Sequence, residues 1–201
     1  GLSRSASDLG GDRYRHTVVD VTDAKYGGLL EAAVDVLGGV DLCVYAAGIG
    51  EFLDVTDLAA QTRTLEVNLI GAARTVQTVV PRMLPAGAGH IIGISSLADA
   101  TASGPAPAYN ASKAGLSTYL RGLALALRPY GVTVTTVRIG FVDTKMAKAD
   151  HKPAMMSVNQ AVDLLIDAIA TRPAVVARPR IMALAMRLLD VVTTVQLRKR
   201  P

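Results

Sequence analysis

The chain has 201 residues, half of them hydrophobic, and carries a net charge of +4. This length and composition fit a single domain with one sizeable core. The single cysteine excludes an intramolecular disulfide framework and favours a reducing compartment, so we expect a cytoplasmic location. No signal peptide is visible at the start, and no uncharged run reaches the ~20 residues that a membrane-spanning helix needs.

The positive charge is concentrated in the C-terminal stretch. Residues 178–201 hold six Arg and Lys against one acid, Asp190, whereas the rest of the chain holds fifteen against sixteen. A nucleic-acid-binding surface would need a basic face with interleaved aromatic side chains. This stretch has no aromatic residue, so we expect no nucleic-acid partner.

Taken in order, the sequence alternates short apolar runs with stretches of helical spacing. The apolar runs predict strands at 16–20, 40–45, 90–94, 132–139 and 174–177. The helical stretches are 25–37, about 57–84, 108 to about 130, and 158–171, the last with Ser157 as its N-cap. Strands that alternate with helices predict an α/β fold built from parallel βαβ units, with ligands at the carboxyl ends of the strands. Cys43 falls within the second apolar run, which indicates a buried structural thiol rather than a nucleophile.

The central stretch, 90–113, is the most informative. It reads as a strand, a loop rich in turn residues, and a helix that carries Tyr109 and Lys113 four residues apart. At 3.6 residues per turn, these two side chains lie on the same helix face. A nearby ammonium favours the phenolate form and lowers a phenol pKa from its usual value near ~10. Ser96, at the end of the strand, can hydrogen-bond the same substrate oxygen. A lone Tyr and Lys at this spacing usually serve only packing or surface roles, so the interpretation depends on the whole pattern.

That pattern has thirteen residues from Ser96 to Tyr109 and four to Lys113, with Ala111-Ser112 before the lysine. It resembles the active-site segment of the short-chain dehydrogenase/reductase family. The resemblance implies a Rossmann-like, doubly wound parallel sheet with helices on both faces. It also implies a catalytic set of Asn68, Ser96, Tyr109 and Lys113, in which Asn68 holds a water beside the lysine.

Other family features are present over residues 2–146. Asp20-Val21 resembles the pair that binds the adenine, and 140–144 resembles the loop that holds the nicotinamide end, with Ile139 where a proline is common. Tyr45-Ala46 replaces two asparagines of the usual Asn-Asn-Ala-Gly. The cofactor-binding residues implied are Arg4, Asp20, Val21, Ala46, Ala47, Gly48, Tyr109, Lys113, Gly140, Val142 and Thr144.

Arg4 bears on cofactor choice. If 2–5 ends a strand, its guanidinium lies where a 2′-phosphate would be, and arginine there favours NADP(H) over NAD(H). The alternative is a solvated loop arginine.

One family feature is missing. The family opens with a strand and a Gly-rich turn that receives the cofactor diphosphate. No Gly-x-x-x-Gly-x-Gly occurs near the start of this sequence. Two explanations are open: roughly thirty residues, about the length of such a unit, precede Gly1 in the natural protein, or the chain is a truncation that cannot bind cofactor normally. We favour the first, because the catalytic spacing is kept.

The C-terminal third diverges from the family. Residues 145–157 are expected to form a substrate lid, in which Met146, Met155 and Met156 either line an apolar pocket or pack beneath the loop. Residues 178–201 form a basic, apolar extension whose mostly apolar part, 181–197, fits a subunit interface, a cover over the substrate site, or a helix at a membrane surface. We favour the first two, and expect a homodimer or homotetramer.

Together these features predict an NADP(H)-dependent oxidoreductase that reduces a ketone, or oxidises the alcohol, with Tyr109 as general acid/base and no metal. The substrate is expected to be a small hydrophobic molecule. The alternative is a weakly active or inactive cofactor-binding or interaction protein on the same scaffold.

Overall fold

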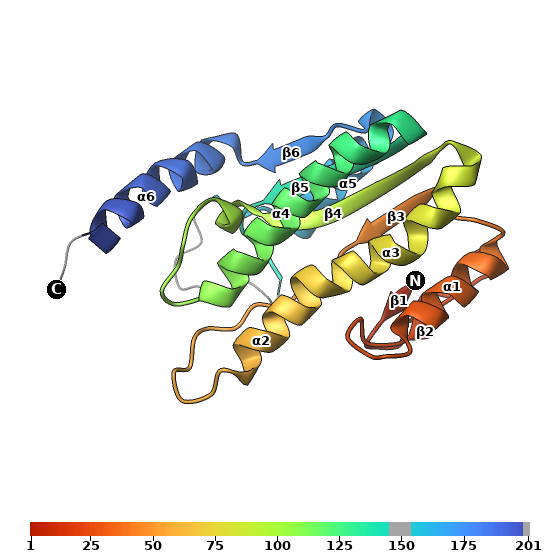
Figure 1. The fold of residues 1–201 in the computed structure, drawn as a ribbon, viewed down its shortest axis with the longest axis horizontal. Helices are drawn as coiled ribbons and strands as arrows, with labels where there is room; N and C mark the ends of the chain where they lie inside the picture. Colours follow the sequence, from red (N-terminus) through yellow and green to blue (C-terminus); the bar gives the residue numbers. More distant parts are fainter. Residues whose placement is uncertain (145–153, 199–201) are drawn as a thin grey trace.

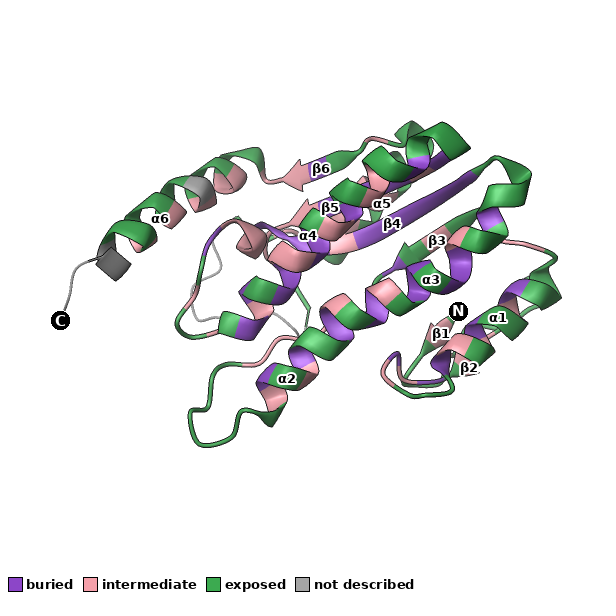
Figure 2. Cartoon of the chain, in the orientation of Figure 1, coloured by how far each residue is buried: buried purple, intermediate pink, exposed green. Residues whose placement is uncertain are grey.

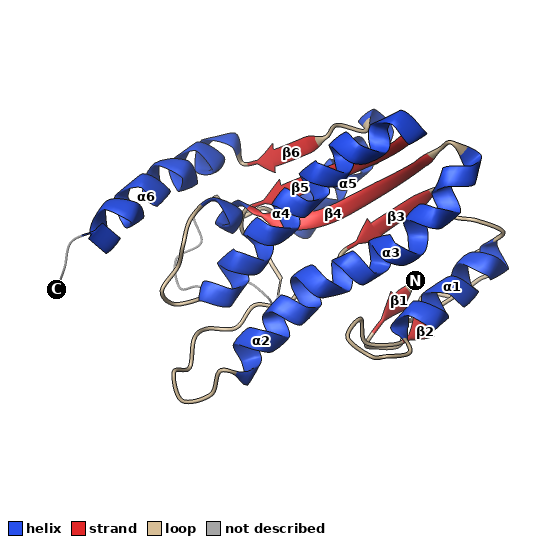
Figure 3. Ribbon diagram, in the orientation of Figure 1, coloured by secondary structure: helices blue, strands red, loops and turns tan. Residues whose placement is uncertain are grey.

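The computed structural model describes residues 1–144 and 154–198 (Figure 1). Strands and helices alternate along the chain (Figure 3). The strands are β1 (Leu2–Ser3), β2 (Thr17–Val18), β3 (Leu42–Tyr45), β4 (Gly89–Ser96), β5 (Val132–Ile139) and β6 (Val175–Arg178). The helices are α1 (Tyr26–Leu37), α2 (Ala59–Leu65), α3 (Gly71–Met83), α4 (Pro107–Leu127), α5 (Val158–Thr171) and α6 (Arg180–Arg198). Shorter helical turns are η1 (Glu66–Ile70), η2 (Leu84–Ala86), η3 (Leu97–Ala100) and η4 (Arg128–Tyr130).

All strand pairs are parallel, which confirms the predicted fold class. β3, β4, β5 and β6 form one sheet in that order, and β1 pairs with β2 separately. The strand predicted at 16–20 is shorter than expected, because only Thr17–Val18 pairs with β1.

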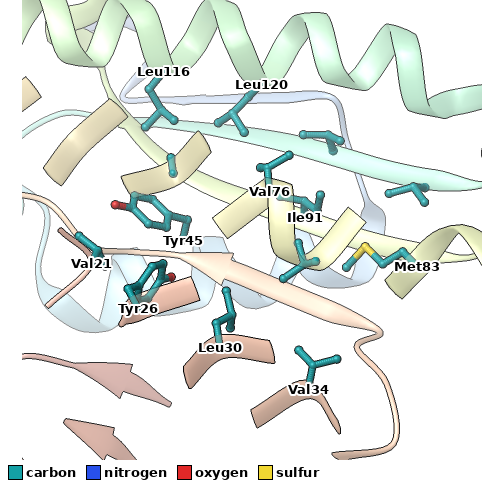
Figure 4. Close-up of a cluster of buried hydrophobic side chains, with 14 of the residues drawn as sticks. Val21, Tyr26, Leu30, Val34, Tyr45, Val76, Met83, Ile91, Leu116 and Leu120 are labelled. Carbon is teal, nitrogen blue, oxygen red and sulfur yellow. The ribbon is translucent and has the colours of Figure 1, made fainter. Parts of the chain in front are cut away.

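Successive side chains on the central strands face opposite layers, because a strand has a side-chain period of two. Ile91 packs in the cluster formed with α1, α3 and α4, whereas Ile92 packs with Ala168 of α5 (Figure 4 shows the first cluster). Burial on both faces explains why β4 reads as a continuous apolar run rather than an alternating one. It is also the most continuously buried strand in Figure 2.

A cavity of about 830 Å³ lies between the two sheets. It is lined by residues of β1, α1 and β3, and by the loop that follows β3. Among the described residues, no strand joins β1 to β3 across it. Cys43 of β3 lines this cavity and is half-buried rather than buried as expected; burial raises the pKa of its thiol to about 11.

The long helix predicted at about 57–84 is interrupted by η1, a π-helical turn between α2 and α3. Such turns insert one extra residue per turn and are frequent at functional sites. The helix predicted at 158–171 is confirmed as α5, with a capping box formed by Ser157 and Gln160.

The predicted apolar C-terminal stretch is helix α6, which extends away from the sheet in Figure 1. Its exposed apolar residues include Ile181, Leu184, Leu188 and Val191. No helix in the described part of the chain is long and apolar enough to cross a membrane.

Candidate active site

The four predicted catalytic residues come from three elements that meet at the carboxyl end of β4. Ser96 is the last residue of β4, Tyr109 and Lys113 lie on successive turns of α4, and Asn68 lies in η1. Ser96, Tyr109 and Lys113 line a cavity of about 540 Å³. α4 starts with Pro107, which is suited to a first helical position, so the loop before it delivers Tyr109 to the cavity on the first turn.

Lys113 is buried, at 5% exposure. Its Nζ atom donates a 2.9 Å hydrogen bond to the carbonyl oxygen of Ile94 and lies 5.8 Å from the centre of the Tyr109 ring. Burial lowers the pKa of the ammonium to about 8. The charge is therefore held beside the phenol at neutral pH, but a proton leaves it more readily than from an exposed lysine.

The pKa of Tyr109 differs from the sequence-based expectation. Burial of the ring raises it, the hydrogen bond with the Ser96 side chain acts to lower it, and the charge of Asp99 raises it further. The net direction is upward, so the expected lowering by Lys113 is wrong for the described structure. The physical reason is desolvation, which disfavours the phenolate more strongly than neighbouring groups favour it.

Ser96 caps the turn that follows it. Its Oγ atom accepts a 3.1 Å hydrogen bond from the Ala98 backbone N–H. This contact holds the Ser96 hydroxyl at the cavity, next to the Tyr109 phenol that it hydrogen-bonds.

Asn68 is fully buried and joins two parts of the site. Its side chain donates to the Ile49 carbonyl at 2.9 Å and accepts from the Ile49 N–H at 2.8 Å. The amide also donates to Ser112 Oγ at 2.9 Å, and Ser112 donates to the Tyr109 carbonyl at 2.8 Å. Asn68 therefore ties the loop after β3 to the helical turn that carries Tyr109. The water-holding role implied by the resemblance stays a prediction.

The predicted cofactor-binding residues divide between the two cavities. Those expected at the nicotinamide end line the smaller cavity: Gly140, Val142 and Thr144, with Tyr109 and Lys113. Those expected at the adenine end line the larger one: Arg4, Asp20, Val21, Ala46, Ala47 and Gly48. Ala46 and Gly48 line both, so the two cavities meet at the carboxyl end of β3. The residues expected at the two ends of the cofactor therefore line two adjoining cavities.

Asp20 has protein partners that the sequence did not reveal. Its carboxylate accepts hydrogen bonds from the Thr22 N–H at 2.9 Å and hydroxyl at 2.8 Å, and pairs with Arg63 at 2.6 Å. These contacts and the charge of Arg4 outweigh partial burial, and the pKa of Asp20 is lowered.

Three further contributions were missed. Arg13 and Arg15 line the larger cavity with Arg4, although the polar sequence around them carries no motif. A Cβ atom added to Gly50 would lie 3.0 Å from Cδ2 of Tyr109, so the absence of a side chain there makes room for the Tyr109 ring.

The residues lining the apolar side of the smaller cavity also differ from expectation. Met182 and Met186 of α6 line it, whereas Met155 and Met156 do not. Met156 instead exchanges backbone hydrogen bonds with Phe141 and Asp143, at 2.8 and 2.9 Å. The remaining part of the predicted lid, including Met146, lies outside the described residues.

Comparison with known proteins gives a consistent result. A family profile described as short chain dehydrogenase matches residues 2–154. An uncharacterized oxidoreductase of Myxococcus xanthus is 35% identical over 158 residues, which are 77% of this chain and 62% of the relative. One from Staphylococcus aureus is 31% identical over 151 residues, 74% of this chain and 65% of the relative. The chain thus spans less than two thirds of the length of these relatives.

Among solved structures, a short-chain dehydrogenase from Sphingobium yanoikuyae, determined in complex with NADPH, is similar in fold. Its TM-score is 0.76 at 23% identity, with 92% of this chain and 76% of that chain covered.

Proposed function

This chain belongs to the short-chain dehydrogenase family, and we propose that it is an NADP(H)-dependent oxidoreductase that reduces a ketone or oxidises the corresponding alcohol. The observation that carries the proposal is the convergence of Ser96, Tyr109 and Lys113 on one cavity. A phenol, a hydroxyl and a buried ammonium are the groups that proton transfer to a carbonyl oxygen requires.

Each residue has one task in this mechanism. When bound, the nicotinamide supplies or accepts the hydride. Ser96 donates a hydrogen bond to the carbonyl oxygen, and Tyr109 donates the proton to the same oxygen during reduction. Its raised pKa keeps the phenol protonated, as a proton donor must be. Lys113 places positive charge beside the ring and supports proton replacement, for which its pKa of about 8 is suited.

The preference for NADP(H) is supported by charge. Arg4, Arg13 and Arg15 all line the larger cavity near the expected adenine end, whereas Asp20 is already paired with Arg63. Guanidinium groups suit a 2′-phosphate, because they offer several donors and remain charged. Apolar side chains on the smaller cavity, among them Phe52, Leu97 and Phe141, favour a hydrophobic carbonyl substrate.

A calorimetric titration of the full-length protein with NADPH and NADH tests the cofactor. We expect tighter binding of NADPH, weakened by Arg4→Ala but not by Arg121→Ala, which changes an exposed arginine outside both cavities. Preference for NADH would overturn the role of Arg4 while keeping the enzyme. A screen of hydrophobic ketones then tests turnover, with Tyr109→Phe as the variant expected to be inactive.

A cofactor-binding or interaction protein with little turnover is the second candidate. One observation favours it: Tyr45 stands where the family has an asparagine, and its hydroxyl is committed to the Val67 carbonyl oxygen at 2.5 Å. Failure of a folded full-length protein to bind either nucleotide would favour the interaction protein. Nucleotide binding without turnover of any carbonyl would favour the inactive binder.

A further inference from the structure

A buried ion pair adjoins the candidate active site, because Asp99 lies in the turn after Ser96 and its charge acts on Tyr109. The side chains of Asp99 in η3 and Arg138 in β5 are 4% and 11% exposed. Arg138 donates two hydrogen bonds to the Asp99 carboxylate, from Nε at 2.6 Å and from Nη2 at 2.5 Å. Burying two charges carries a large desolvation cost, which can cancel the gain from pairing them. Net stability is therefore a weak explanation for the pair, and its position suggests another.

The pair is connected to the helix that carries the catalytic tyrosine and lysine. Ser117, one turn beyond Lys113 on α4, donates a 2.5 Å hydrogen bond to the same Asp99 carboxylate. Ser95 Oγ lies 2.7 Å from Ser117 Oγ and 3.1 Å from the Lys113 carbonyl oxygen. Ser95 is also the register partner of Arg138 across β4 and β5, so the network closes on itself.

One member of the pair, Asp99, lies in the turn that follows Ser96. η3 begins at the next residue, and the Ala98 N–H is bonded to the Ser96 hydroxyl oxygen. Asn110 of α4 donates to the Ala98 carbonyl at 3.0 Å, which ties this turn to α4 a second time. Because Asp99 is the next residue after Ala98, its anchoring by Arg138 sets where η3 lies.

We propose that Asp99, clamped by Arg138 and Ser117, is a positioning residue that holds Ser96 in register with the turn of α4 carrying Lys113. This inference rests on the proposed function, because the register matters only where these groups act on one substrate atom. Three elements, η3, α4 and β5, are joined through this one carboxylate.

The charge of Asp99 also affects the candidate active site, in addition to its effect on position. It raises the pKa of Tyr109 and so favours the phenol over the phenolate. The other charged groups around Tyr109 in the described structure are Lys113 on its own helix, Arg138 behind Asp99, and Glu51 from the loop after β3, which lines the same cavity. Removing only the Asp99 charge leaves Arg138 uncompensated, so the phenol pKa should fall.

Steady-state kinetics of Asp99→Asn test the proposal. We expect kcat for reduction to fall about tenfold or more, as small misplacements of catalytic groups do, with KM for the nucleotide unchanged. The alkaline limb of the pH profile should move to lower pH, because the proton donor is lost earlier. Asp35→Asn is the matched control: it breaks an exposed pair with Arg82, at 2.7 Å, and should change neither quantity.

Two further variants separate charge from geometry. Ser117→Ala keeps both charges and should lower kcat without moving the pH profile. This variant also tests the positioning role if Asp99→Asn does not fold. In Asp99→Asn/Arg138→Gln the pair is neutral again, so the pH limb should return toward that of the unchanged protein while kcat stays low. If the alkaline limb of the double variant stayed at the lower pH, the proposed effect of the Asp99 charge on Tyr109 would be wrong.

A readout that needs no turnover distinguishes this proposal from the proposed function. NMR of protein labelled with ¹³C-tyrosine, with the Tyr109 signal assigned by Tyr109→Phe, reports the phenol pKa directly. A lower value in Asp99→Asn is expected even if no carbonyl is reduced, in which case only the proposed function fails. A folded Asp99→Asn protein with unchanged kcat and unchanged phenol pKa would overturn the inference.

Discussion

The Nζ atom of Lys113 lies 5.8 Å from the centre of the Tyr109 ring, one turn further along the same helix. Its hydrogen bond goes to a backbone carbonyl at the end of β4, not to the phenol. The ammonium is therefore held by the sheet, and its charge is nearly shielded from solvent. A charge buried with one neutral partner is expected to reduce the stability of the folded state.

We predict that Lys113→Met abolishes turnover but stabilises the fold at pH 7. The pKa of Lys113 is lowered from 10.5 to about 8, so the unfolded chain binds this proton more tightly than the folded one. Wild-type stability should therefore rise as the pH increases through this window, and the advantage of the variant, on the order of 1–3 kcal/mol at pH 7, should shrink. Urea unfolding followed by circular dichroism at pH 7 and pH 10 measures the stability of the two proteins and the difference between them.

The exposed Lys25 offers the matched control for that comparison. Lys25→Met removes an ammonium that is already in water and should not stabilise the fold at pH 7 as Lys113→Met does. A Lys113→Met protein that is less stable than wild type at pH 7, by the same margin as at pH 10, would show that burial of the ammonium has no such cost.

Gly50→Ala should impair catalysis without unfolding the protein. The added Cβ atom would lie 3.0 Å from the Tyr109 ring, so the ring must move by a few tenths of an ångström. Because proton transfer depends steeply on position, we expect kcat to fall by roughly tenfold. Gly104→Ala, where the added atom meets nothing within 4 Å, should have the kinetics of the unchanged protein. Equal kinetics in the two variants would contradict the close approach.

Asn68 should contribute to stability as well as to the site. Asn68→Ala removes the buried side-chain amide and leaves the Ile49 N–H and carbonyl, and the Ser112 hydroxyl, without this partner. Leaving such groups unpaired should cost about 2–4 kcal/mol, measurable as a lower urea midpoint. Ser112→Ala, which removes one of these bonds, should cost less. A larger loss in Ser112→Ala than in Asn68→Ala would show that Asn68 is not the centre of this connection.

The sequence predicted those features of the structure whose sequence signal lies within a few neighbouring residues. The helix 158–171 and the strand 132–139 were predicted with their observed bounds, because capping and apolar periodicity act within a few residues. The set Ser96, Tyr109 and Lys113 was implied by the resemblance of the whole segment to the family, and the three residues line one cavity. The direction of the Tyr109 pKa shift was not predicted correctly, because desolvation depends on what the rest of the chain places around the ring.

The residues that were missed are those defined only by tertiary contacts. Arg63 meets Asp20 across 43 positions of sequence, and Asp99 meets Arg138 across 39. No periodicity or motif joins such pairs. The π-helical turn at Asn68 was missed for a related reason, since local propensity predicts one uninterrupted helix there.

His90 should make the stability of this protein sensitive to mild acid. It is 1% exposed at the start of β4, its Nε2 atom lies 2.8 Å from Thr135 Oγ1, and its Nδ1 atom has no hydrogen-bond partner among the described residues. Burial and the charge of Arg172 lower its pKa below the usual 6.5. Near pH 6.5 the His90 side chain is therefore protonated in the unfolded chain but still neutral in the folded protein. The free energy of unfolding should then fall as the pH drops below that value.

The variant His90→Leu isolates this contribution. Thr135 keeps its 2.6 Å hydrogen bond to the Pro173 carbonyl, so the substitution leaves no new unpaired hydroxyl. Urea midpoints measured between pH 7.5 and 5.5 should decline in the unchanged protein and stay flatter in His90→Leu. Parallel declines in the two proteins would assign the acid sensitivity to other groups instead.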